Sequence, residues 1–490
     1  MSSPQSRAMV PRVFHFNIPS RARATLVAFA SGTALLAGCA SYKAQPLATG
    51  PSLTTQDALA RVQIDPAKMP LPELAAHRFD PSNGFDIEDV AMLAVANNPD
   101  LKLARDDLGI AQAQAFSAGL LPDPQVSISS DYPGAAGLSR AFSYGLSMDV
   151  MAIVTRGANT KSANATVRKT DLGLLWQEWQ VVAQAKQLYV RARFQDEVLP
   201  LLEQQTALAR TRYERTAHAA SEHNVTADSV TASLTAYEDA RKQYTDMRHA
   251  REQTHHDLNA LLGLAPDTTL TLTGDTAVTP MPDGTLDAAV AKLAQRRPDL
   301  IALQAGYEAQ EQKYRAAILN QFPSLSVGFT RQRDTSEIYT SGFAINLTLP
   351  VFNRNRGNIA IEQATRQRLA DEYQTRLNAA YADIAHLRAD SAIAAHQLDQ
   401  DDAALPGLER AAVQARDAYA AHNIVLGQYV DAQTAALARR IDAATARDAL
   451  AEQRVGLQAL LGSAIPDPDQ TASARGATAE SAPTNTIVAR

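Results

Sequence analysis

The sequence predicts a mainly α-helical fold with a small β part, built as two tandem structural repeats in which a strand hairpin interrupts long helices. The duplication carries this prediction: Asn-Pro-Asp-Leu at 98–101 recurs as Arg-Pro-Asp-Leu at 297–300, 199 positions later. Both copies also end alike, with Ala-Leu-Leu-Gly at 260–263 and again at 459–462. The chain is 46% hydrophobic but only 6% aromatic, a composition typical of long helices.

The N-terminus has the pattern of a secretory signal peptide, which we place at 1–38. Basic residues precede an apolar run at 25–36, and no acidic residue interrupts them. The run is short for a membrane-spanning helix. The sequence leaves open whether translation starts at Met1 or at Met9.

Leu36-Ala37-Gly38-Cys39 resembles the bacterial lipobox, in which the cysteine thiol is acylated. Cys39 is the only cysteine, so the chain cannot form an intrachain disulfide. We therefore expect lipidation at Cys39, with an incidental thiol as the alternative. Removing 1–38 takes away four arginines and changes the formal net charge from −6 to −10, which argues against a nucleic-acid partner.

The helical elements follow from proline positions. We expect a short helix at 87–97, then a helix that starts at Pro99 and runs to about Leu120, where Pro122 and Pro124 end it. The stretches 158–262 and 358–461 hold one proline each and predict very long helices. A helix of about 60 residues would be roughly 90 Å long, so each stretch should fold back once, near 221–228 and 422–428.

The strand hairpins are predicted at 125–150 and 324–350, where apolar and polar residues alternate up to Val150 and Leu349. Two hairpins supply four strands, too few to close a barrel, and an open edge cannot survive in lipid. Three chains would supply twelve strands, enough for a barrel with an aqueous lumen. A soluble sandwich that buries the apolar face is the alternative.

In order and in duplicate, these motifs resemble the TolC-like outer-membrane efflux factors over residues 85–465. The markers are the Pro-Asp-Leu helix starts, Leu-Leu-Pro-Asp-Pro at 120–124, and Leu-Pro-Val-Phe at 349–352 followed by Arg356-Gly357. The resemblance implies a trimer with a twelve-stranded outer-membrane barrel and a twelve-helix periplasmic tunnel gated at its periplasmic tip. It also implies three kinds of partner: a periplasmic adaptor (membrane fusion) protein, an inner-membrane pump of the RND or a related type, and outer-membrane lipid.

On this basis the chain divides into six segments. They are the signal peptide (1–38), a lipidated extended segment (39–85), the first repeat (86–265), an equatorial connector (266–284), the second repeat (285–465) and a disordered tail (466–490).

The resemblance places gate residues at the tip. Tyr419 and Asp228 stand where a tyrosine and an aspartate lock adjacent helix pairs in the family. Asp431 matches a lumen-facing aspartate, which in a trimer would form a ring of three carboxylates that favours cations. Gln428 stands where the family has a second lumen-facing aspartate. The alternative for each is an ordinary solvated residue near a helix turn.

Two tip positions depart from the family pattern: Ile424 replaces an arginine of the lock, and His422 replaces the usual glycine. Together with Glu222 and His223, they are our candidates for contact with the adaptor.

The sequence contains no nucleophile elbow, phosphate-binding loop or zinc motif, so we expect neither an enzyme nor a cofactor or metal site. Two function classes remain: an outer-membrane efflux channel, and a structural coiled-coil envelope lipoprotein without a conduit. The exported substrate, whether metal ion, drug or solvent, is open.

Overall fold

The computed structural model describes residues 42–134, 136–276 and 278–461. The chain divides into two units, 1–52 and 53–490. In the first, residues 42–52 are exposed and carry no regular secondary structure. The predicted signal peptide, Cys39 and the predicted tail lie outside the described residues. The following concerns the second unit.

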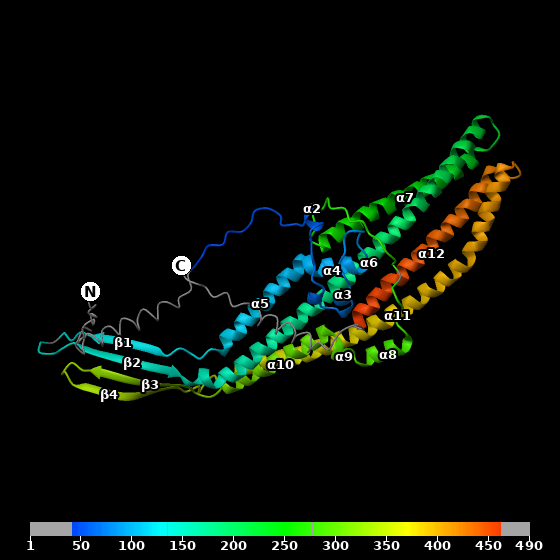
Figure 1. Cartoon of the computed structure of the whole chain (residues 1–490). Helices are drawn as coiled ribbons and strands as arrows, with labels where there is room; N and C mark the ends of the chain where they lie inside the picture. The colour runs from blue at the N-terminus through cyan, green and yellow to red at the C-terminus, as the bar shows by residue number, and fades with distance from the viewer. Residues whose placement is uncertain (1–41, 135, 277, 462–490) are drawn as a thin grey trace, which may run out of the picture. The chain divides into compact units, whose positions relative to one another are not determined.

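The first repeat follows the predicted order of helix, hairpin and helical pair (Figure 1). Its elements are α4 (Ile87–Asn97), α5 (Pro99–Gly119), β1 (Gln125–Asp131), β2 (Ala141–Asp149), α6 (Val150–Ser221) and α7 (Ala227–Leu261). The short helix and the proline-led helix are therefore confirmed. Asn98 explains the sharp start of α5, because its side chain accepts a hydrogen bond from the Leu101 amide at 2.9 Å.

The second repeat has the same order. Its elements are α8 (Asp283–Ala291), α9 (Leu293–Arg296), α10 (Pro298–Leu319), β3 (Ser324–Arg333), β4 (Tyr339–Thr348), α11 (Arg356–Ala420) and α12 (Leu426–Leu461). Both long stretches fold back once, and the turns at 222–226 and 421–425 lie at the expected positions. Among the described helices, none has a stretch both long and apolar enough to cross a membrane.

Helix α6 begins earlier than the sequence predicts. The alternating pattern places Val150 in a strand, but Val150 is the first residue of α6. The cause is Asp149, whose carboxylate accepts hydrogen bonds from the amides of Met151 (2.8 Å) and Ala152 (3.3 Å) and so caps the helix. The 72-residue helix is about 108 Å long and follows the strand without a loop.

The four strands form one antiparallel sheet in the order β1-β2-β3-β4, so that β2 and β3 join the two repeats. Residues paired across strands share a face. The register Val126↔Leu146↔Phe329↔Phe343 therefore lies on one face. The full apolar set on that face is Val126, Ile128, Phe142, Tyr144, Leu146, Met148, Leu325, Val327, Phe329, Phe343, Ile345 and Leu347.

The opposite face carries small polar residues and glycine, as in the register Ser127↔Gly145↔Thr330↔Gly342. Within residues 42–134, 136–276 and 278–461, nothing covers this apolar face: Val126 is 71% exposed and Phe343 89%. The described part of the chain therefore does not bury this face in the core of a sandwich.

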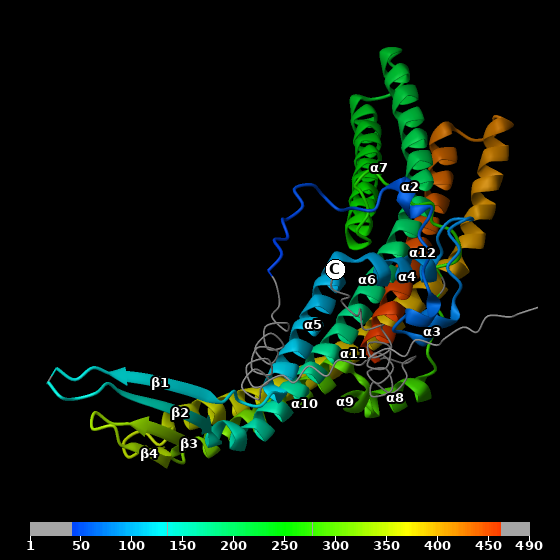
Figure 2. The ribbon, with the colours of Figure 1, turned by 60° about the vertical axis from the view of Figure 1, so that its left-hand side comes forward.

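The core lies at mid-length, where residues 53–85, here called the strap, cross α4 and α6 (Figure 2). Leu59 and Phe85 of the strap pack with Leu93 of α4 and Tyr189 of α6, and burial of each such side chain contributes about 1.5–3 kcal/mol. We predicted an extended segment at 39–85. Within the strap, three short helical turns interrupt it: α2 (Gln56–Leu59), η1 (Pro66–Lys68) and α3 (Pro72–Ala76). Two of these turns start at a proline, which is favourable there.

Candidate functional site

The two helical hairpins end in turns that are copies of each other. After α6, His223 adopts φ 61°, and after α11, His422 adopts φ 59°, the left-handed conformation that closes a helix. In both turns the following asparagine amide bonds back into the helix: Asn224 to the Ala219 carbonyl at 2.9 Å, and Asn423 to the Ala418 carbonyl at 2.8 Å. Duplication therefore extends to the tip, with a histidine where glycine would be unstrained.

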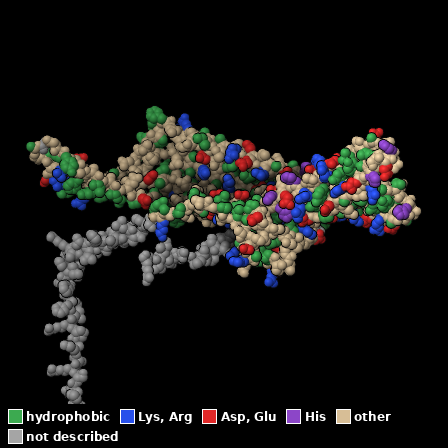
Figure 3. All heavy atoms as spheres, turned by 90° about the horizontal axis from the view of Figure 1, so that it is seen from above, with side chains coloured by type: hydrophobic (Ala, Val, Ile, Leu, Met, Phe, Trp, Pro, Cys, Tyr) green, Lys and Arg blue, Asp and Glu red, His purple; other side chains and the backbone are tan. Residues whose placement is uncertain are grey.

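These turns expose three of the four predicted adaptor-contact residues. Glu222, His223 and His422 are exposed, and Ile424 is half-buried. Figure 3 shows histidine side chains at the surface of the tips, in purple. The residues come from two different hairpins, so each chain offers two related but unequal turns.

Two predicted gate residues lie in the first turns of α7 and α12, the helices that follow the tip turns. Asp228 lies in the first turn of α7, where a carboxylate favourably faces the positive end of the helix dipole. The Gln428 side chain accepts a hydrogen bond from the Val425 amide at 3.4 Å, at the start of α12. Both residues are exposed.

Tyrosine stacks hold each hairpin together. Tyr419 of α11 stacks on Tyr429 of α12, with ring centroids 5.0 Å apart and planes at 12°. Tyr213 of α6 stacks on Tyr237 of α7 at 6.1 Å and 4°. An aromatic pair adds about 0.5–1.5 kcal/mol beyond its buried area, so each hairpin is stiffened as a unit. In the described chain, no hydrogen bond joins Tyr419 to Asp228.

Ion pairs connect the two hairpins. Near the tip, the Arg212 guanidinium of α6 donates to the Asp431 carboxylate of α12 at 2.5 Å. Further from the tip, Arg447 pairs with Glu197 at 3.3 Å. Arg191 pairs with Glu452 at 2.7 Å.

This connection is weak at the tip and strong below it. The Arg212 and Asp431 side chains are 40% and 65% exposed, and such a pair contributes about 0.5 kcal/mol, which salt reduces. Below it, Val198, Leu202 and Ala444 pack in a buried cluster. The two hairpins are therefore held together more weakly at the tip than beneath it.

The pairing changes what Asp431 can do. The predicted ring of three Asp431 carboxylates in a trimer would therefore have an Arg212 guanidinium paired with each carboxylate within its own chain. Sequence reasoning missed Arg212, because it lies 219 positions from Asp431 and no local pattern connects them.

A cleft of about 410 Å³ lies below the tips, between α6, α12 and residues 274–276. Arg193, Arg447 and Asp448 are among its lining residues. Burial, together with the smaller effect of the nearby Glu452, raises the pKa of Asp448 to about 7, and Arg191 opposes the shift. The cleft thus contains a carboxyl group that exchanges a proton near neutral pH.

Comparison with known proteins identifies a family match. Residues 289–463 match the family model described as outer membrane efflux protein. No curated protein sequence matches the chain.

Solved structures share the fold at low sequence identity. The Campylobacter jejuni CmeC outer membrane channel is 17% identical, with a TM-score of 0.65 over 90% of this chain and 94% of that one. The outer-membrane channel OprN is 16% identical, with a TM-score of 0.64 over 85% and 98%. The Neisseria gonorrhoeae MtrE outer membrane channel, in its open state, is 19% identical, with a TM-score of 0.61 over 77% and 88%.

Proposed function

We propose that this chain, whose residues 289–463 belong to the outer membrane efflux protein family, is the outer-membrane channel subunit of a tripartite efflux system. In this proposal a homotrimer carries substrates outward from an inner-membrane pump and a periplasmic adaptor. The observation that carries it is the sheet: one face is mostly apolar, with Arg331 and Arg333 near the β3–β4 turn, the other face carries small polar residues, and β1 and β4 are edge strands.

The sheet cannot work alone in a membrane. Each backbone N–H and C=O at an edge strand needs a partner in lipid, so β4 of one chain would pair with β1 of the next. Three chains give a closed ring of twelve strands with the apolar face toward lipid. Serine, threonine and glycine would then line a lumen in contact with water.

The helices continue this wall into the periplasm. Helices α6 and α11, of 72 and 65 residues, would span about 108 Å and 98 Å. Together with α7 and α12 they supply four helices per chain and twelve per trimer, which would form the tunnel. A tunnel of this length brings the tips close to partners at the inner membrane.

The tip is the proposed gate. In a closed state, the stiff hairpins of neighbouring chains would meet through Tyr419 and Asp228, with Gln428 at the same level. Within each chain, Arg212 and Asp431 hold the two hairpins side by side. Because these links are exposed and polar, binding of an adaptor has enough free energy to break them.

The adaptor would contact the two turns at Glu222–His223 and His422–Ile424. A trimer presents six such turns of two alternating kinds. Anchoring by Cys39 would add to the membrane affinity of the barrel: a single lipidated terminus holds a protein only weakly. Cys39→Ala should therefore weaken membrane retention but leave the trimer intact, and a soluble monomeric variant would contradict the barrel.

The test is single-channel recording in planar lipid bilayers with the purified full-length protein. We expect discrete conductance steps. Variants that weaken the contacts at the tip should leave a smaller fraction of the channels closed. A structural coiled-coil lipoprotein would give no current in the same bilayers. Protein denatured by boiling before reconstitution is the control.

A further inference from the structure

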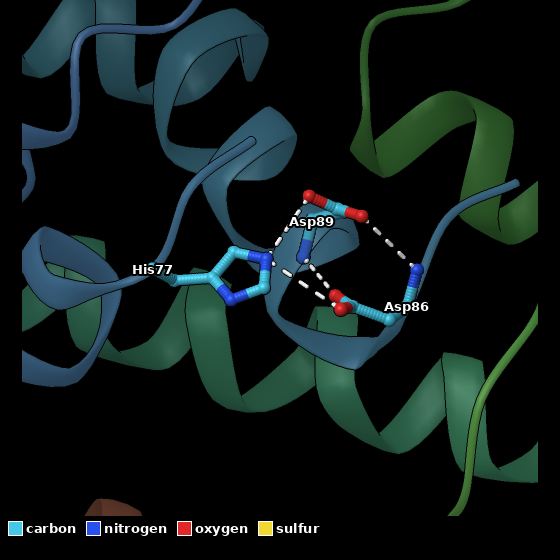
Figure 4. A group of neighbouring side chains, drawn as sticks. All are labelled: His77, Asp86 and Asp89. Carbon is cyan, nitrogen blue, oxygen red and sulfur yellow. Dashed lines mark hydrogen bonds and ion pairs between the residues drawn. The ribbon is translucent and has the colours of Figure 1, made fainter. Parts of the chain in front are cut away.

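A cluster of polar side chains lies where the strap meets α4, far from the tip turns in the sequence. It consists of His77, which follows α3 in the strap, and Asp86 and Asp89 at the start of α4 (Figure 4). The sequence predicted no metal site, and the spacing of these three residues matches no zinc motif.

The start of helix α4 orients both carboxylates. One Asp86 oxygen accepts a hydrogen bond from the Asp89 amide at 2.7 Å, and one Asp89 oxygen accepts from the Asp86 amide at 3.3 Å. This reciprocal cap leaves one oxygen of each carboxylate for other contacts. Both of these oxygens face the same atom, His77 Nε2, at 3.5 Å from Asp86 and 3.2 Å from Asp89.

The three donor atoms have the spacing of a metal site. They lie within 4.8 Å of one another. Neighbouring ligands of a tetrahedral zinc ion, each about 2.0–2.1 Å from the metal, are roughly 3.3 Å apart, close to the two distances from His77. The backbone amides hold the carboxylates as outer-shell partners do in metal sites, and so does the Asp80 amide, which donates to Asp89 at 3.3 Å.

Charge and exposure also suit a cation. A neutral imidazole with two carboxylates carries two negative charges, which a divalent ion would balance. Two further carboxylates, Glu73 and Glu88, share Lys186 at 2.9 and 3.9 Å, so the charge of this ammonium group is already paired outside the cluster. The Asp89 side chain is 5% exposed and the His77 side chain 26%, which leaves an outer side for a water ligand.

We propose that His77, Asp86 and Asp89 bind one divalent transition-metal cation of the zinc class, which fastens the strap to α4. The donor set of one imidazole and two carboxylates suits borderline cations of this kind. The bound ion would join the strap to the helix that carries much of the mid-length core. This role is structural and does not depend on whether the protein conducts.

The experiment is isothermal titration of the full-length protein in detergent with zinc chloride at pH 7.5, after chelator treatment. We expect one saturable zinc ion per chain. His77→Ala should weaken the affinity at least about 10-fold. Asp86→Ser should do the same while keeping the helix cap, since serine is also a good capping residue. His386→Ala is the matched control, because His386 pairs with Asp390 at 2.7 Å on an exposed helix face.

The outcomes separate the proposal from its alternative. If both cluster variants bind zinc at least about 10-fold more weakly and His386→Ala binds it as the wild type does, the site is established. If the wild type shows no saturable binding, or His77→Ala binds equally well, the proposal fails and the contacts of His77 with the two carboxylates serve only to hold the strap against α4. Circular dichroism without zinc checks that each variant is folded, and Asp86→Ser provides the test if His77→Ala is not.

Discussion

The ion pair between Arg212 and Asp431 makes a quantitative prediction about gating. Asp431→Asn removes the negative charge from a pair joined at 2.5 Å whose side chains are 40% and 65% exposed. An exposed pair of this kind contributes about 0.5 kcal/mol. Three copies in the proposed trimer contribute about 1.5 kcal/mol, which is roughly a 10-fold change in the open-to-closed ratio if the tips move together.

The assay is the open probability of single channels in planar bilayers. We expect Asp431→Asn to raise it at about 0.1 M salt and to have less effect at about 1 M, where the Debye length falls from roughly 10 Å to 3 Å. The double variant Arg212→Asp with Asp431→Arg restores opposite charges and should return toward the wild type. Unchanged gating at low salt, or a swapped variant that behaves like the single one, would refute the reasoning.

Three further predictions concern stability, each measured by thermal unfolding of the solubilised protein. His422→Gly should stabilise by about 1 kcal/mol, because glycine adopts the left-handed conformation at φ 59° without strain; a loss of stability would mean that the imidazole makes a needed contact. The folded-state pKa of Asp448, about 7, lies above the ordinary 3.8, so stability falls as pH rises from about 4 to 7. Asp448→Asn should remove this loss, and its advantage in stability over the wild type should grow between about pH 4 and pH 7 and then level off. Asp401→Ala should cost about 3 kcal/mol, because Asp401 is fully buried and pairs with Arg439. The exposed pair of Glu409 and Arg440 is the control, and Glu409→Ala should cost under about 1 kcal/mol.

Local signals predicted the elements of the fold well. Pro99 and Pro298 start helices because proline is favourable in the first turn, and the Asn98 cap acts within three residues. The strands follow from alternation at neighbouring positions. The boundary at Val150 was wrong because one side chain, Asp149, caps the helix inside what the alternation marks as a strand.

Contacts between distant segments could not be predicted in the same way. The cap formed by Asp86 and Asp89 is a local pattern, but the position of His77 beside it depends on the path of the strap across α4. The pairing of Arg212 with Asp431 depends on how α12 packs against α6. Neither path leaves a periodic signal in the sequence. Tyr419 was expected to act between helix pairs, and its stack on Tyr429 within one hairpin was not foreseen.

The central claim is that three chains close one ring of strands, and a disulfide trap tests it most directly. In one chain, β1 and β4 are separated by three strand spacings, about 14 Å, which exceeds the roughly 7 Å that a disulfide can span. Double-cysteine variants, made in a Cys39→Ala background, would join Ser127 of β1 with Thr340, Gly342, Ala344 or Asn346 of β4, all on the polar face. Oxidised samples on a denaturing, non-reducing gel should give a covalent trimer for at least one pair. Monomer alone for every pair, or an open-ended ladder of larger species, would contradict the account.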